Sequence, residues 1–301
     1  MVRGAHHPAA LTVDLEDIAH AELVRHRAPG AAAGSRIARS TARLLDLFDR
    51  KGVRATFFVV GELLRKEPET IRRIARSDHE IGCHSYSHRP LWELSPEEFR
   101  AELREFQAAL AEVVPGARAA GFRAPTFSVD RRTAWALGVL EDEGFAYDSS
   151  VVPARGPLYG CPGAPLSIYR PSREDICRHD PGGRLVEFPA PVADLGIAKV
   201  PVGGGIYFRL LPFRVYRRLF ERVLARRPGF VYVHPWETDP ETPRVPLPLA
   251  ARCATYSGLR GMLGKLERLV DTVRFTTMAG AISQSLERET PWTSKSASSS
   301  S

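Results

Sequence analysis

The chain has 301 residues, and 42 Lys and Arg against 35 Asp and Glu give it a formal net charge of +7. Hydrophobic residues make up 44% and charged residues 26%, which is typical of a folded globular protein and excludes a wholly disordered chain. No run of about 18 apolar residues occurs, so the sequence predicts no membrane span. Because residues 1–10 are polar and a strand-like run begins at Leu11, we expect no signal peptide and a cytoplasmic protein.

The basic balance does not indicate a particular partner. The positive charge is mostly arginine, and the spacing of its densest cluster indicates the solvated face of one helix more than a surface for an anionic partner. We therefore expect no nucleic-acid partner. The four cysteines show no CxxC spacing and are expected to be structural thiols in a reducing compartment. The arginine cluster consists of Arg214, Arg217, Arg218, Arg222, Arg226 and Arg227.

Strands and helices are predicted to alternate along the chain. Such alternation predicts a parallel sheet with helices outside, and functional side chains just after the strands. A stretch rich in Pro and Gly, 152–184, indicates a long surface excursion. We expect strands at 10–14, 55–60, 79–83, 121–124, 145–149, 185–188, 198–202, 230–234 and 274–276. Helices are expected at 36–50, 68–76, 95–114, 130–143, 213–225, 259–270 and 278–286.

Two polar motifs follow predicted strands early in the chain. The sequence DLED at 14–17 places three carboxylates close together, where they repel one another unless a cation holds them. An exposed acidic turn or a helix N-cap is the alternative interpretation. His84 and His88 have the i, i+4 spacing that puts two imidazoles on one face of a helical turn. With one carboxylate they would form a metal site that leaves positions for water and substrate.

Other predicted strands also end in polar side chains. Arg123 precedes a rigid turn and can orient a carboxylate, although a structural ion pair is equally consistent. His234 ends an apolar strand and could protonate a leaving group, with a hydrogen-bonded core histidine as the alternative. Asp148 ends another strand and could pair with His234 and raise its pKa. Gly204 lies in a glycine run that would let backbone approach a ligand.

The order of these segments resembles that of the NodB-type polysaccharide deacetylases, carbohydrate esterase family four. Between them, ATFFVVG at 55–61 is similar to that family's ATFF-x-x-G strand. HEIGCH at 79–84 resembles its GHEI-x-x-H, with Asp78 where glycine is usual. The resemblance spans about Leu11 to Glu237. The segments GFRAPTFS, YDSS, PVGGGIYFRLLP and HPWE look more specifically like the branch found in bacterial exopolysaccharide loci.

The resemblance implies an α/β fold, a distorted (β/α) barrel with fewer than eight strands, in a single catalytic domain. It also implies a divalent metal held by Asp17, His84 and His88, with Zn²⁺ expected and Co²⁺ or Ni²⁺ as alternatives. The family's first motif has two adjacent aspartates, whereas this chain has DLED. Glu16 could therefore take the role of either Asp14 or Asp17.

The resemblance further implies removal of acetyl groups from N-acetylated amino sugars in a polysaccharide, oligosaccharide or glycoconjugate. Asp14, oriented by Arg123, would take a proton from water, and His234, tuned by Asp148, would protonate the departing amine. Partners of a polysaccharide-assembly complex are also implied. The candidate substrate contacts are Glu16, Tyr86, Pro125, Phe127, Gly204 and Trp236.

We expect a flexible N-terminus at 1–9, a deacetylase domain at 10–288 and a disordered Ser-rich tail at 289–301. Two other functions stay open. One is an allantoinase-like hydrolase of small cyclic amides, which the two-histidine spacing disfavours. The other is a catalytically silent carbohydrate-binding relative, which the DLED spacing keeps open.

Overall fold

The predicted strands assemble into one parallel sheet of eight strands. The structure is a computed structural model, and it describes residues 6–27, 36–156, 159–196 and 199–289. Residues 1–5 of the expected flexible N-terminus and 290–301 of the expected tail lie outside these ranges. The sheet consists of β1 (Ala9–Leu15), β2 (Thr56–Val59), β3 (Glu80–Cys83), β4 (Gly121–Phe122), β5 (Tyr147–Asp148), β6 (Val186–Glu187), β9 (Gly229–Val233) and β10 (Phe275–Thr276).

Seven of these strands follow one another around the sheet in the order β9-β1-β2-β3-β4-β5-β6. The first strand, β1, pairs with three others. Its residues Ala9–Val13 pair with β9, its residues Thr12–Leu15 pair with β2, and its first two residues also pair with β10. All of these pairings are parallel. The expected α/β distorted barrel is therefore confirmed. The predicted strand at 198–202 is not part of it, because β8 (Lys199–Pro201) pairs antiparallel with β7 (Val192–Asp194) in a separate sheet.

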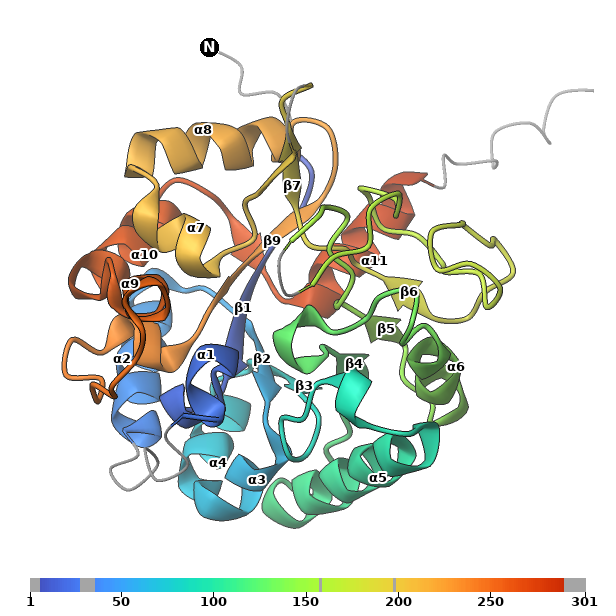
Figure 1. Cartoon of the computed structure of the whole chain (residues 1–301), viewed down its shortest axis with the longest axis horizontal. Helices are drawn as coiled ribbons and strands as arrows, with labels where there is room; N and C mark the ends of the chain where they lie inside the picture. Colours follow the sequence, from blue (N-terminus) through green and yellow to red (C-terminus); the bar gives the residue numbers. More distant parts are fainter. Residues whose placement is uncertain (1–5, 28–35, 157–158, 197–198, 290–301) are drawn as a thin grey trace, which may run out of the picture.

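Helices surround the barrel, as Figure 1 shows. Most lie within a few residues of their predicted ranges; α5, for example, starts with the expected capping box, in which Ser95 and Glu98 satisfy each other's backbone N–H groups. The helix predicted from residue 130 begins only at Trp135. The helices are α1 (Glu22–Arg25), α2 (Ile37–Lys51), α3 (Gly61–Lys66), α4 (Pro68–Arg76), α5 (Pro96–Val113), α6 (Trp135–Asp142), α7 (Gly205–Leu210), α8 (Phe213–Leu224), α9 (Leu249–Tyr256), α10 (Met262–Val270) and α11 (Met278–Glu289). Short 3₁₀ turns are η1 (Ile18–His20), η2 (Leu91–Glu93), η3 (Pro125–Phe127), η4 (Pro235–Thr238) and η5 (Leu259–Gly261).

Side-chain alternation along the strands separates the core from the site. In β1, Leu11, Val13 and Leu15 join the large apolar cluster shared with the surrounding helices. The intervening side chains of Thr12 and Asp14 point the other way, toward the inside of the barrel. The same alternation holds in β9, where the valines join the large cluster and the aromatic residues face inward. Polar side chains therefore meet inside the barrel at the carboxyl ends of the strands.

Within the described part of the chain, no helix is long and apolar enough to cross a membrane.

Candidate active site

Arg123 occupies the centre of the barrel interior and is completely buried. Its Nη1 donates to Asp14 Oδ1 over 2.7 Å and to Thr12 Oγ1 over 2.8 Å, and its Nη2 donates to Ser149 Oγ over 3.0 Å. Its guanidinium also lies 4.3 Å from the centre of the Phe58 ring. Because Nε, Nη1 and Nη2 all donate hydrogen bonds, Arg123 holds the carboxylate of Asp14 in one orientation. This is the contact expected for a positioned base.

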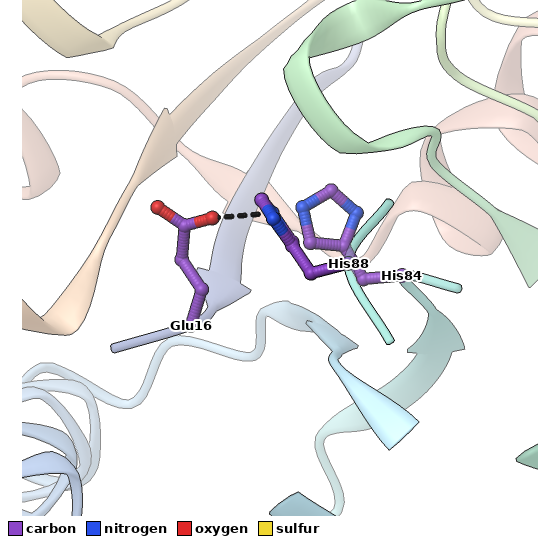
Figure 2. A group of neighbouring side chains, drawn as sticks. All are labelled: Glu16, His84 and His88. Carbon is purple, nitrogen blue, oxygen red and sulfur yellow. Dashed lines mark ion pairs between the residues drawn. The ribbon is translucent and has the colours of Figure 1, made fainter. Parts of the chain in front are cut away.

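Beside Asp14 lies a group of side chains that can hold a metal ion: Glu16, His84 and His88 (Figure 2). One ligand atom from each lies within 4.8 Å of the others, and all three residues are buried. His88 Nε2 lies 2.6 Å from Glu16 Oε2, yet neither ring nitrogen of His88 makes a well-oriented hydrogen bond. Buried polar atoms without such bonds are costly, so this donor set fits a divalent cation.

The protonation states of the group also suit a metal. Burial lowers the pKa of His84 to about 4, so its imidazole is neutral at pH 7. Its Nδ1 lies 2.6 Å from the carbonyl oxygen of Arg123, which assigns the proton to Nδ1 and leaves Nε2 as the ligand atom. Burial alone would raise the pKa of Glu16, but His88 and His234 outweigh it and hold that pKa far below its usual range. Glu16 is therefore a carboxylate.

The segment between the two histidines is not the helical turn expected from the i, i+4 spacing. Ser85 has φ 61° and His88 has φ 59°, left-handed values that are unfavourable for these residues. Glu102 on α5 stabilises this conformation, since its carboxylate accepts hydrogen bonds from the hydroxyl groups of Ser85 and Ser87 and from two backbone N–H groups. One glutamate thus fixes the loop that brings the histidines together.

Asp17 does not join the metal-capable group. It is the N-cap of η1, where its side chain accepts the N–H of Ala19 over 3.2 Å and its own N–H donates to His20 Nδ1 over 3.0 Å. Strand alternation explains the difference, because Glu16 continues the inward series of Thr12 and Asp14 whereas Asp17 falls on the other side. An N-cap was the alternative interpretation of this acidic motif. Of its three carboxylates, Asp17 is the one that caps a helix.

His234 projects from the end of β9 toward the same carboxylates. Its Nε2 lies 3.7 Å from Glu16 Oε1 and 4.0 Å from Asp14 Oδ2. Its Nδ1 lies 3.1 Å from Glu237 Oε2, and Glu237 in turn binds Arg209 of α7 over 2.8 Å. Burial alone would lower the pKa of His234, but Glu237 and Glu16 outweigh it and raise the pKa to about 9. His234 is thus a protonated acid at neutral pH.

The pairing of Asp148 with His234 is contradicted. Asp148 is paired in register with Glu187 of β6, and its side chain bonds Glu187 and Ser150 instead. Alternation again gives the reason: Ser149 binds Arg123 inside the barrel, so its neighbour Asp148 points to the opposite face. Glu237 occupies the position beside His234 that the sequence interpretation gave to Asp148.

The candidate substrate contacts fall into different places. Trp236 belongs to the site: it stacks on His234 with ring centroids 5.3 Å apart, and its Nε1 donates to Glu16 Oε1 over 3.2 Å. Phe127, which follows Pro125 in η3, packs against the Tyr232 ring at 5.2 Å. Tyr86 instead covers Gly61 and accepts a hydrogen bond from Arg65 of α3. The backbone of Gly204 pairs with Tyr232 of β9.

Three residues of the site were not predicted: Glu237, Arg209 and Glu102. Glu237 carried a usable signal, since a glutamate three residues after a strand-end histidine can return to it in a tight turn. Glu102 carried none, because it looks like any solvent-facing glutamate on a charged helix. Arg209 likewise gives no local sign that it binds the carbonyl groups of Ala254, Thr255 and Ser257 beside Glu237.

Comparison with known proteins agrees with this geometry. Residues 30–143 match the polysaccharide deacetylase family model, and residues 149–283 match a domain of unknown function, DUF3473. Over 156 residues the chain is 33% identical to a peptidoglycan deacetylase-like protein of Gibberella zeae, a match that covers 49% of this chain and 45% of that protein. Over 86 residues it is 36% identical to a chitooligosaccharide deacetylase of Rhizobium leguminosarum, covering 28% and 38%. The chain thus spans less than half the length of these curated relatives.

A solved structure extends the likeness over the whole fold. The crystal structure of a Mycobacterium smegmatis protein assigned to the polysaccharide deacetylases matches 99% of this chain and 96% of its own, with a TM-score of 0.61 and 21% sequence identity. At this identity the likeness shows the fold alone. The two sequence models together extend from residue 30 to residue 283, so the first half of the chain is similar to the polysaccharide deacetylases and the second half to DUF3473.

Proposed function

We propose that this protein is a metal-dependent hydrolase that removes acetyl groups from N-acetylated amino sugars. One observation carries the proposal: a buried Glu16, His84 and His88 group lies beside an Asp14–Arg123 ion pair and beside His234, whose Nε2 faces the same carboxylates. Base, acid and ligand atoms for a Lewis-acidic ion are the three elements that amide hydrolysis needs. The family match supports an acetylated sugar as the amide substrate, since the printed names of the relatives are those of sugar deacetylases.

The residues of the chain divide this chemistry among them. A bound divalent ion, with Zn²⁺ as the expected metal, would supply Lewis acidity toward the acetamide carbonyl and a water molecule. Asp14, held by Arg123, accepts the proton of the attacking water. His234 donates the proton on Nε2 to the departing amine, while Glu237 faces its Nδ1 and stabilises the imidazolium. Acetate and a free amino sugar are the products.

The ligand set in this proposal is Glu16, His84 and His88, with Glu16 in place of Asp17. Two observations support Glu16 as the ligand: the short distances between its carboxylate and the two imidazoles, and the alternation of side chains along β1, which turns Glu16 toward the inside of the barrel. The resemblance of the GFRAPTFS and HPWE segments to the exopolysaccharide-locus branch supports a bacterial polysaccharide precursor or a short oligosaccharide as substrate.

Acetate release tests the function. We would offer chitooligosaccharides, UDP-N-acetylglucosamine and allantoin to chelator-treated protein, and then add Zn²⁺ or Co²⁺. The proposal expects acetate from at least one sugar, and only after metal is restored. Turnover of allantoin without metal would contradict it and favour the cyclic-amide hydrolases. Stoichiometric metal binding with no acetate from any N-acetyl sugar would favour a silent relative.

The Asp14→Asn variant separates the base from the metal site. Losing a positioned base is expected to reduce turnover by about 10²–10⁴-fold. The metal content should stay unchanged, because Asp14 is not in the ligand group. Elemental analysis beside the acetate assay checks both, and a variant with full turnover would remove Asp14 from the proposed mechanism.

A further inference from the structure

The connection between β5 and β6 contains two cysteines that meet in space. Cys161 and Cys177 are sixteen positions apart, and their Sγ atoms lie 3.3 Å apart. Both are free thiols in the structure. Disulfide bonds require Cβ vectors that converge, and sulfur atoms already in contact meet that requirement with a small approach. The two remaining cysteines, Cys83 on β3 and Cys253 on α9, make no such contact.

Each cysteine is anchored to a different part of this connection. The backbone N–H of Cys161 donates to the carbonyl oxygen of Val152, just after β5, over 2.7 Å. Cys177 follows Ile176, whose carbonyl accepts the hydroxyl of Tyr169 over 2.8 Å, and Tyr169 pairs with Glu187 of β6. A bond between the sulfur atoms would therefore join the two halves of a long irregular segment, each half already fixed to a neighbouring strand.

The connection reaches the site through an aromatic chain. Tyr159, two residues before Cys161, packs on Phe127 with ring centroids 5.8 Å apart. Phe127 packs on Tyr232, and Tyr232 on His234 at 5.6 Å. A shift of Cys161 would therefore move the row of aromatic rings that ends beside His234, the proposed acid. We propose that Cys161 and Cys177 are an oxidative modification site, at which a disulfide bond closes the β5–β6 connection and restrains this row of aromatic rings.

The local chemistry gives the two sulfur atoms different roles. Cys177 is partly exposed, and Arg131 Nη2 lies 3.1 Å from its Sγ, so a cation accompanies the accessible sulfur. Cys161 is buried, and burial raises the pKa of its thiol to about 12. Cys177 therefore attacks first, on an external disulfide RS–SR, and releases RS⁻. Cys161 then attacks the mixed disulfide, loses its proton and expels the second RS⁻. Two protein thiols become one disulfide, and RS–SR becomes two RSH.

The test uses the full chain equilibrated with oxidised or reduced glutathione, then denatured and labelled with N-ethylmaleimide. Oxidised wild-type protein should take up two labels instead of the four that its cysteines allow, and peptide mapping should find Cys161 joined to Cys177. Cys253→Ser is the matched control and should keep the cross-link. Four labels after oxidation, or a link that involves Cys83 or Cys253, would overturn the proposal.

Thermal unfolding tests whether the bond restrains the fold. Cross-linking a loop of this length predicts that reduction lowers the Tm of wild-type protein by roughly 5–10 °C. The Tm of Cys161→Ser should not respond to the glutathione state, whereas Cys253→Ser should respond as wild type does. An equal response in Cys161→Ser would show that the restraint does not come from this bond. Neither readout depends on acetate release, so the outcome is independent of the proposed enzyme activity.

Discussion

At the scale of single residues, Glu16 and Asp17 differ by one position and have different surroundings. Glu16 lies 2.6 Å from a ring nitrogen of His88, whereas Asp17 caps η1. We therefore expect Glu16→Gln to weaken Zn²⁺ binding by about 100-fold or more, since a neutral amide replaces a charged ligand. Asp17→Asn should bind Zn²⁺ as wild type does, because asparagine also caps helices. Equilibrium dialysis with metal analysis compares the two variants, and the reverse ranking would restore Asp17 as the ligand.

His234 and Glu237 form the second pair that single-residue changes can separate. In metal-free protein the pKa of His234 is raised to about 9, although burial acts to lower it, because carboxylates face the ring. Glu237→Gln keeps the shape of the side chain and removes its charge, so we expect the pKa of His234 to fall, since Glu237 is the carboxylate that raises it most. The NMR titration of the imidazole measures it, with Glu221→Gln on the surface of α8 as the control.

The same pair makes stability depend on pH. A histidine whose pKa is higher in the folded than in the unfolded chain stabilises the fold when it is protonated. This stabilisation is complete below pH 6.5, the ordinary pKa, and is lost as the pH rises to about 9, the pKa in the folded protein. The loss between these two values should be smaller in Glu237→Gln than in wild type. An unchanged His234 titration in the variant would mean that Glu16 and Asp14 set the pKa without Glu237.

At the scale of elements, the glycine run before α7 supports β9. The backbone of Gly204 pairs with Tyr232, its φ is 151°, and a Cβ there would overlap the carbonyl oxygen of Tyr232. We therefore expect Gly204→Ala to lower the free energy of unfolding by about 3 kcal/mol. Gly264→Ala on α10 is the matched control, because a Cβ there meets nothing within 4 Å, and it should stabilise by about 0.5–1 kcal/mol. Urea unfolding measures the change in the free energy of unfolding for both variants. Equal changes would show that the close approach of Gly204 to Tyr232 does not exclude a side chain.

The alternation of side chains between the two faces of a strand also explains how much of the structure could be predicted. Continuous apolar runs such as β2 identified the parallel strands, and the polar residues that follow β1, β3, β4 and β9 do converge. Asp17 lies outside the metal-capable group and Asp148 bonds Glu187 in place of His234 for one reason: each falls on the side of its strand that faces away from the inside of the barrel, and the prediction used strand ends without strand faces. Contacts made by Glu102 and Arg209 could not be predicted, because they depend on how helices distant in sequence pack beside the site.

At the scale of the whole molecule, the two matched family models do not correspond to two separate units. The DUF3473 match at 149–283 supplies β6, β9 and β10 of the same sheet to which the deacetylase match at 30–143 contributes β2 to β4. His234 and Glu237 come from the former, His84, His88 and Arg123 from the latter, and Asp14 and Glu16 precede both. Neither matched part alone contains base, ligands and acid, so the proposed chemistry requires the complete barrel.

The stability of that barrel should depend on pH through one buried carboxyl pair, Asp148 and Glu187. Burial raises the pKa of both groups, and that of Glu187 lies well above its ordinary value of 4.5, so the folded pair retains a proton that the unfolded chain releases. The folded state is therefore favoured at low pH and loses stability as the pH rises above 4.5, by at most about 1.4 kcal/mol per pH unit. Glu187→Gln removes this linkage, while its amide can still accept the N–H of Val151 and donate to Asp148.

We accordingly expect Glu187→Gln to gain stability over wild type as the pH rises from 5 to 8, with the smallest difference at the acid end of that range. Urea unfolding at several pH values measures the difference, and Glu174→Gln, an exposed glutamate of the same connection, is the control that should show no such trend. A difference that does not change with pH would mean that the folded pair holds no extra proton. Asp148 would then be a charged group with Glu187 as a charged neighbour, an arrangement that burial of both side chains makes far more costly.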